Sequence, residues 1–171
     1  MKVIDDFLSE GEFDTVSNFF NSSSLPWLFN DHIAGENDSL DNFQFVHNFF
    51  NNAKPFRNYS TYADFIRPVI NKISPHSLIR VKANLRPRTS QPFQSDFHTD
   101  FEFPQKTAIF YINSNDGYTV FEDDSTKVFS KANRLLVFDG SRRHAGTSCT
   151  DQKARLVLNI NYHPTELDPL R

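Results

Sequence analysis

The chain has 171 residues, 23% of them charged, and a formal net charge of −3. This length can bury one sizeable hydrophobic core, but the charge lacks the excess of lysine and arginine that binding to a nucleic-acid backbone requires. We therefore expect a single domain, residues 1–171, and no nucleic-acid partner. The one cysteine, Cys149, excludes an internal disulfide and fits a reducing compartment.

The N-terminal sequence MKVIDDFLSE has acids where a signal peptide has its apolar centre. No segment approaches the ~20 apolar residues that cross a membrane. The sequence thus predicts a cytoplasmic protein without a membrane partner, and it leaves the oligomeric state open.

Residues 1–77 predict a helical support for the remainder of the chain. A capping box over residues 9–12, SEGE, predicts the start of a helix, and Phe13, Val16, Phe19 and Phe20 continue it as an apolar stripe. Residues 21–58 show no sustained period and predict irregular or short elements. Residues 60–74 predict a second amphipathic helix that Pro68 bends.

From residue 78 the apolar period changes from about 3.6 to 2. The segments SLIRVKANL, KTAIFYIN, YTVFED, KVFS, NRLLVFDG and ARLVLNINYH read as successive short strands separated by turn signals. Together they predict a mainly β (α+β) fold, an antiparallel sandwich or jelly roll over residues 78–164, with the two helices on one outer face. Residues 165–171 read as a tail.

The longest segment without a period, residues 86–97, reads as a loop and a candidate substrate-binding lid. Two of its residues, Arg86 and Arg88, are candidates to steer an acidic or peptide substrate, although such arginines are often simply solvated.

A candidate metal site comes directly after this loop in the sequence FHTD. His98 and Asp100 are two residues apart, so in an extended chain their side chains point the same way. His144, at the end of the strand RLLVF, supplies a third ligand. Two histidines and one carboxylate leave positions open on a metal, as ferrous oxygenases require, although zinc accepts the same set.

A candidate anion-binding group lies on the last predicted strand. Arg155 alternates with Leu156, so it can point inward while the leucines face the helices. A buried guanidinium needs an anion, either a structural acid or a co-substrate carboxylate. Tyr111, which shares a strand face with Thr107, could donate its hydroxyl to the same carboxylate. Asn84 is a further candidate for the pocket, or else a surface residue.

These motifs together carry a resemblance. FHTD, TAIFYIN, DGYTVFED, RLLVFDGSRRHAG and RLVLNINY resemble the catalytic core of the 2-oxoglutarate- and Fe(II)-dependent dioxygenases, in the branch that contains the prolyl 4-hydroxylases. The match covers about residues 80–163. Asp116-Gly117 replaces the usual Gly-Gly. Arg155 stands where collagen-type members have lysine, which favours the bacterial and oxygen-sensing relatives, and the chain as a whole resembles a small stand-alone member of the bacterial or viral type.

The resemblance implies a double-stranded β-helix with a catalytic set of His98, Asp100, His144 and Arg155. The first three would bind Fe(II), and Arg155 would bind 2-oxoglutarate with Tyr111, Asn84 and Thr107 as further co-substrate-binding candidates. The implied reaction uses O2 and hydroxylates an unactivated C–H bond, with ascorbate as a candidate reductant. The implied partner is a peptide or protein substrate, with hydroxylation of a peptidyl residue such as proline, or a small molecule.

Alternatives remain at this point. The substrate could be a free amino acid or another small molecule, or the protein could be a non-catalytic jelly-roll module that binds a metal. A nucleic-acid demethylase generally carries a second arginine six residues after the first, where this chain has Asn161. A cupin-type site usually has more histidines close together than FHTD offers.

Overall fold

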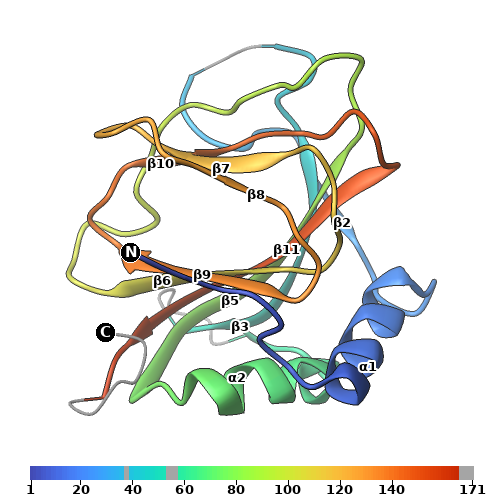
Figure 1. The fold of residues 1–171 in the computed structure, drawn as a ribbon, viewed down its shortest axis with the longest axis vertical. Helices are drawn as coiled ribbons and strands as arrows, with labels where there is room; N and C mark the ends of the chain where they lie inside the picture. Colours follow the sequence, from blue (N-terminus) through green and yellow to red (C-terminus); the bar gives the residue numbers. More distant parts are fainter. Residues whose placement is uncertain (37–38, 53–57, 166–171) are drawn as a thin grey trace.

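Two antiparallel β-sheets face each other, and the helices pack on the outer face of the larger sheet (Figure 1). The computed structural model describes residues 1–36, 39–52 and 58–165. The larger sheet has the strand order β1-β9-β6-β11-β5-β3-β2, and β4 pairs with β3. Its strands are β1 (Lys2–Ile4), β2 (Leu28–Asn30), β3 (Gln44–Asn51), β4 (Asn58–Tyr59), β5 (Ser77–Pro87), β6 (Lys106–Tyr111), β9 (Arg134–Asp139) and β11 (Ala154–His163).

The smaller sheet has the order β10-β7-β8. It consists of β7 (Tyr118–Phe121), β8 (Lys127–Phe129) and β10 (His144–Gly146). With its two facing antiparallel sheets, the structure confirms the predicted mainly β, jelly-roll fold class. The strands predicted from residue 78 onward are all present, and β10 is an additional strand too short to show a period.

The first helix, α1 (Glu10–Asn21), begins at the predicted capping box. The backbone N–H and the hydroxyl of Ser9 donate to the Glu12 carboxylate at 3.0 and 2.6 Å. The second predicted helix is divided into a 3-10 turn, η1 (Ala63–Ile66), and α2 (Arg67–Ile73). Pro68 lies in the first turn of α2 instead of bending a longer helix, because a first-turn N–H has no intrahelical acceptor to lose.

The helices and the larger sheet bury one hydrophobic cluster between them. Val16 and Phe20 of α1 and Val69 of α2 pack in the same cluster as Leu158 and Ile160 of β11. A second cluster lies between the two sheets and consists of Ile109, Tyr111, Phe121, Val128, Leu136, Phe138 and Val157. Alternate residues of β11 thus face the helices and the inter-sheet space, as the period of two predicts.

The N-terminal region differs from a purely helical support. β1 pairs with β9, and β3 pairs with β5, so this region adds strands at both ends of the larger sheet. β3 was missed because its register shifts between Asn48 and Phe50, where an irregularity interrupts the alternation of side chains. Of the predicted tail, only Thr165 belongs to the described residues.

The predicted loop over residues 86–97 also starts later than expected, because Arg86 and Pro87 still belong to β5. Backbone hydrogen bonds tie the remaining segment to residues 146–153: Arg88 N to Lys153 O, Thr89 N to Cys149 O, Ser95 N to Gly146 O and Ser148 N to Phe93 O, all between 2.9 and 3.1 Å. Arg88 is exposed, whereas Arg86 is only 4% exposed, so the two arginines have different environments.

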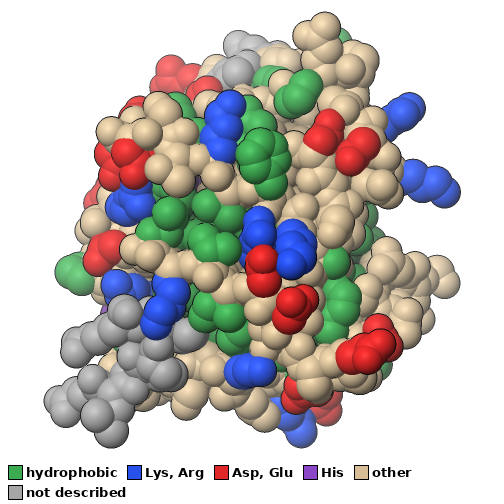
Figure 2. Space-filling view, viewed as in Figure 1, with side chains coloured by type: hydrophobic (Ala, Val, Ile, Leu, Met, Phe, Trp, Pro, Cys, Tyr) green, Lys and Arg blue, Asp and Glu red, His purple; other side chains and the backbone are tan. Residues whose placement is uncertain are grey.

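The face of the molecule in Figure 2 shows lysine and arginine side chains beside aspartate and glutamate side chains. Among the ion pairs of the described residues, Arg142 donates to Asp123 at 2.6 Å and to Asp124 at 3.0 Å. None of the helices in the described part of the chain has the length and apolar character of a membrane span.

Candidate metal centre and anion pocket

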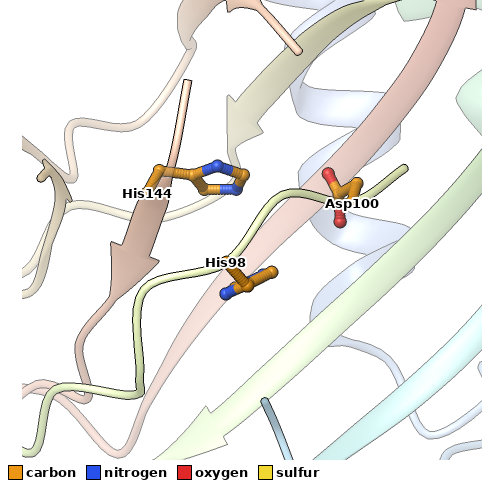
Figure 3. Close-up of side chains that lie close together, drawn as sticks. All are labelled: His98, Asp100 and His144. Atoms are coloured by element: carbon orange, nitrogen blue, oxygen red, sulfur yellow. The ribbon is translucent and has the colours of Figure 1, made fainter. Parts of the chain in front are cut away.

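His98 and His144 lie opposite each other across an antiparallel bridge between the segment before β6 and strand β10. The His98 N–H donates to the His144 carbonyl at 3.0 Å, and the reverse bond measures 2.9 Å. Asp100 follows two residues after His98, and all three side chains point toward one another (Figure 3). Each offers one ligand atom, and these atoms lie within 4.8 Å of one another. The fold therefore brings the predicted triad together from segments 44 residues apart in sequence.

The two imidazoles present the same nitrogen to the site. Nδ1 of His98 is 3.1 Å from the carbonyl of Asp96, and Nδ1 of His144 is 3.2 Å from the carbonyl of Arg142. A carbonyl oxygen only accepts, so in the neutral rings Nδ1 carries the proton and Nε2 keeps its lone pair for a metal. Burial lowers the pKa of His144, which favours this neutral, metal-binding form at pH 7.

Asp100 is held in the ionised form. Its Oδ1 accepts a hydrogen bond from Arg80 at 2.5 Å, and its Oδ2 accepts from Asn161 at 2.9 Å and from Asn159 at 3.2 Å. Burial by itself would raise the pKa of Asp100, but the charge of Arg80, followed by His144 and the Asn161 hydrogen bond, lowers it well below its usual range. Two imidazole nitrogens and an ionised carboxylate oxygen are a donor set that suits Fe(II).

Arg155 lines the same pocket as the three candidate ligands. It is 4% exposed, and its Nε donates to Ser130 at 2.8 Å while its Nη2 donates to Thr119 at 3.1 Å. No ion pair joins Arg155 to a carboxylate of the described residues. The guanidinium is therefore fixed by hydroxyl groups and remains available for an anion.

The remaining candidates differ in position. Asn84 lines the pocket, and its Oδ1 is buried with no hydrogen-bond donor in the described part of the chain. Tyr111 is fully buried and donates its hydroxyl to Thr119 at 2.9 Å. Its ring centroid lies 5.5 Å from the guanidinium carbon of Arg155. Thr107 does not line the pocket, because its register with Asn161 places it farther along the sheet, where it bonds with Gln105 and Asn161.

The pocket also contains groups that the sequence analysis did not assign to it, including Arg86, which was considered only as a substrate-steering residue of the loop. Thr119, Asn159 and Arg86 line it, and Arg80 holds the carboxylate of Asp100. The sequence does carry a signal for Arg80 and Arg86. Their side chains lie on one face of β5, and the buried Val81 and Ala83 lie on the other face. The pattern predicts this face but not the contacts, which depend on pairing with β11.

No protein-family model matches the chain, and no curated protein matches its sequence. Solved structures do match. A prolyl hydroxylase from Trichoplax adhaerens, in complex with a peptide of hypoxia inducible factor, superposes with a TM-score of 0.62 at 13% identity, over 95% of this chain and 82% of that one. HygX from Streptomyces hygroscopicus, with nickel and 2-oxoglutarate bound, has a TM-score of 0.58 at 14% identity, over 99% of this chain and 84% of that one.

A third match is SnoN, an α-ketoglutarate-dependent epimerase of nogalamycin biosynthesis, with a TM-score of 0.65 at 13% identity over 98% of this chain and 82% of that one. The prolyl hydroxylase and the epimerase have different activities, so the likeness concerns the scaffold. The chain thus has the fold of the 2-oxoglutarate- and Fe(II)-dependent oxygenases.

Proposed function

We propose that this protein is a 2-oxoglutarate- and Fe(II)-dependent dioxygenase. The reaction converts 2-oxoglutarate, O2 and a C–H bond of the substrate into succinate, CO2 and a C–OH group. The observation that carries the proposal is the meeting, in one pocket, of a two-histidine, one-carboxylate cluster with a buried arginine that has no acidic partner among the described residues. Either element alone has a structural explanation, but together they match a metal and a dicarboxylate.

In this proposal His98, Asp100 and His144 hold the metal through two Nε2 atoms and a carboxylate oxygen. A ferrous ion bound there would supply the redox chemistry with dioxygen. Arg155 binds the distal carboxylate of 2-oxoglutarate, and Ser130 and Thr119 hold the guanidinium in place. Ile109 and Val157 line the pocket with apolar surface, which limits the access of water to the reacting groups.

For the substrate we propose a peptidyl residue such as proline. The support is the likeness to a prolyl hydroxylase that was solved with a peptide, together with the sequence motifs of that branch. A small molecule such as a free amino acid is the second candidate. It is favoured by the buried Oδ1 atoms of Asn84 and Asn159, which lack donors among the described residues and would accept hydrogen bonds from a polar N–H or O–H group.

The experiment is succinate production by the purified protein with Fe(II), ascorbate, 2-oxoglutarate and O2, with and without proline-rich peptides. The control is the variant His144→Ala. We expect succinate above the control, and stimulation by a peptide would support the peptidyl substrate, whereas stimulation by free amino acids would support the second candidate. Absence of both succinate and 2-oxoglutarate binding, with metal bound, would contradict the proposal and favour a non-catalytic metal-binding module.

A further inference from the structure

A second buried arginine faces Arg155 across the sheet. Arg86 of β5 and Arg155 of β11 are direct partners in the antiparallel register, and each is 4% exposed. Both line the pocket that contains the candidate metal ligands. Their Nη1 atoms converge beside Gly146, since a Cβ on this glycine would lie 3.3 Å from Nη1 of Arg155 and 3.5 Å from Nη1 of Arg86.

This pair of like charges has no counter-charge in the described part of the chain, where no carboxylate forms an ion pair with either guanidinium. The acid of the pocket, Asp100, is already paired with Arg80. Burial, and next the charge of Arg155, lower the pKa of Arg86 to about 9, so it remains protonated at neutral pH. Two buried cations without an anion are unfavourable in a protein interior.

The neighbouring backbone carbonyls do not need Arg86 as a hydrogen-bond donor. Its Nη1 donates to the Gly146 carbonyl at 2.6 Å, and its Nη2 makes a long bond of 3.4 Å to the Phe93 carbonyl. The Gly146 carbonyl also accepts from the backbone N–H of Ser95 at 3.1 Å and from its hydroxyl at 3.3 Å. The Gly146 carbonyl oxygen would still accept the hydrogen bonds from Ser95 if the guanidinium were absent. The hydrogen-bonding need of this carbonyl therefore does not by itself explain a charged side chain at position 86.

We propose that Arg86 and Arg155 form a two-arginine clamp for one carboxylate, the distal carboxylate of the 2-oxo acid. The inference rests on the proposed function and adds a second cation to the arginine already assigned there. An anion beside Gly146 would contact both Nη1 groups and relieve their mutual repulsion. Guanidinium groups are suited to this role because they offer several N–H donors in a rigid plane to a carboxylate.

The test measures binding by titration calorimetry with Ni2+ in place of iron, since imidazole and carboxylate ligands accept nickel. Two ligands are compared: 2-oxoglutarate, and 2-oxopentanoate, which has the same carbon chain without the distal carboxylate. The variant Arg86→Met removes the charge at similar length. Arg88→Met is the matched control, because it removes an exposed arginine two residues away.

We expect Arg86→Met to weaken 2-oxoglutarate binding by about 10- to 100-fold, the usual effect of losing a charge-assisted hydrogen bond. Binding of 2-oxopentanoate should change little, and Arg88→Met should resemble the wild type with both ligands. The melting temperature of the ligand-free variant should stay at or above the wild-type value, because a repulsive buried charge has been removed. The increase in melting temperature that 2-oxoglutarate produces should shrink.

A second variant keeps both arginines and reduces the space between them. In Gly146→Ala the new methyl group stands at the Cβ position beside both Nη1 atoms, so 2-oxoglutarate should bind more weakly while 2-oxopentanoate is less affected. Equal losses for both ligands with a lower melting temperature would overturn the clamp and make Arg86 structural. Unchanged 2-oxoglutarate binding in Arg86→Met would also overturn it. A wild type that binds nickel but neither 2-oxo acid would instead overturn the proposed function, and the clamp with it.

Discussion

Arg80 and Asp100 form a buried ion pair, with Nη2 of Arg80 2.5 Å from Oδ1 of Asp100 and side-chain exposures of 16% and 5%. The Nε of Arg80 also donates to Asn161 at 3.1 Å, and Asn161 donates to the other carboxylate oxygen of Asp100. The carboxylate of the candidate metal centre is thus charge-compensated and oriented by the protein alone. A metal would bind to a carboxylate that is already held in position.

The variant Arg80→Met should therefore destabilise the metal-free protein. Removing one partner of a buried ion pair leaves an uncompensated charge, and we expect the free energy of unfolding to fall by about 3–5 kcal/mol in urea titrations. The control is Arg67→Met, because Arg67 pairs with Asp64 on the surface, where both side chains are more than 60% exposed. It should change stability by less than about 0.5 kcal/mol. Similar losses in both variants would contradict a structural role for the buried pair.

Removing a ligand of the candidate centre should abolish metal binding. We expect His144→Ala and Asp100→Ala to weaken Ni2+ binding by more than about 100-fold, since even the loss of a residue that only supports a ligand costs 10- to 100-fold. Equilibrium dialysis followed by metal analysis measures this. His163→Ala, which removes an exposed histidine, should still bind one ion per chain. Retention of tight binding by Asp100→Ala would exclude this carboxylate from the centre.

Arg155→Met should separate co-substrate binding from metal binding. The guanidinium contacts the hydroxyl groups of Ser130 and Thr119 and no described carboxylate. Its loss should therefore weaken the binding of 2-oxoglutarate at least about tenfold, while Ni2+ binding stays near the wild-type level. Dialysis for the metal and calorimetry for 2-oxoglutarate test both parts. Parallel losses of metal and 2-oxoglutarate would show that Arg155 mainly supports the fold of the pocket.

Tyr111→Phe should affect stability more than co-substrate binding. The Tyr111 hydroxyl donates its hydrogen bond to Thr119. The variant should therefore lose about 1 kcal/mol of unfolding free energy, and its affinity for 2-oxoglutarate should stay within about threefold of the wild-type value. Thr119→Val should reduce both the stability and the binding of 2-oxoglutarate, because the Thr119 hydroxyl accepts hydrogen bonds from Tyr111 and Arg155. If Tyr111→Phe weakened 2-oxoglutarate as strongly as Thr119→Val, the hydroxyl would be a direct ligand, as the sequence suggested.

The pKa of Asp100 predicts a dependence of stability on pH. Its ordinary value is 3.8, and the folded protein lowers it further, because Arg80 and the other partners outweigh burial. A lowered carboxyl pKa stabilises the folded state above the unfolded value, and this contribution is lost as the pH falls toward the folded value. The difference in unfolding free energy between the metal-free wild type and Asp100→Asn should be constant from pH 7 to about pH 5 and shrink below about pH 4. A difference independent of pH would exclude a charged Asp100 in the fold.

The fold could be predicted where side chains keep a regular period. Leu156, Leu158 and Ile160 alternate with Arg155 and Val157, and that alternation alone predicted which side of β11 meets the helices. The strand β3 could not be predicted, because its irregular pairing between Asn48 and Phe50 breaks the period. Local periodicity therefore indicates faces reliably only where the backbone is regular.

The sequence by itself predicted the donor set of the candidate centre, since the spacing of His98 and Asp100 and the position of His144 at a strand end are local features. Only the tertiary structure decided the partners of these groups. Asn161 lies opposite Arg80, so that both can hold Asp100, and Arg86 lies opposite Arg155, because β5 and β11 pair in one particular register. A period of two tells which face a side chain occupies, but its contacts depend on a partner strand about 70 residues away, whose register is set by the packing of the whole sheet.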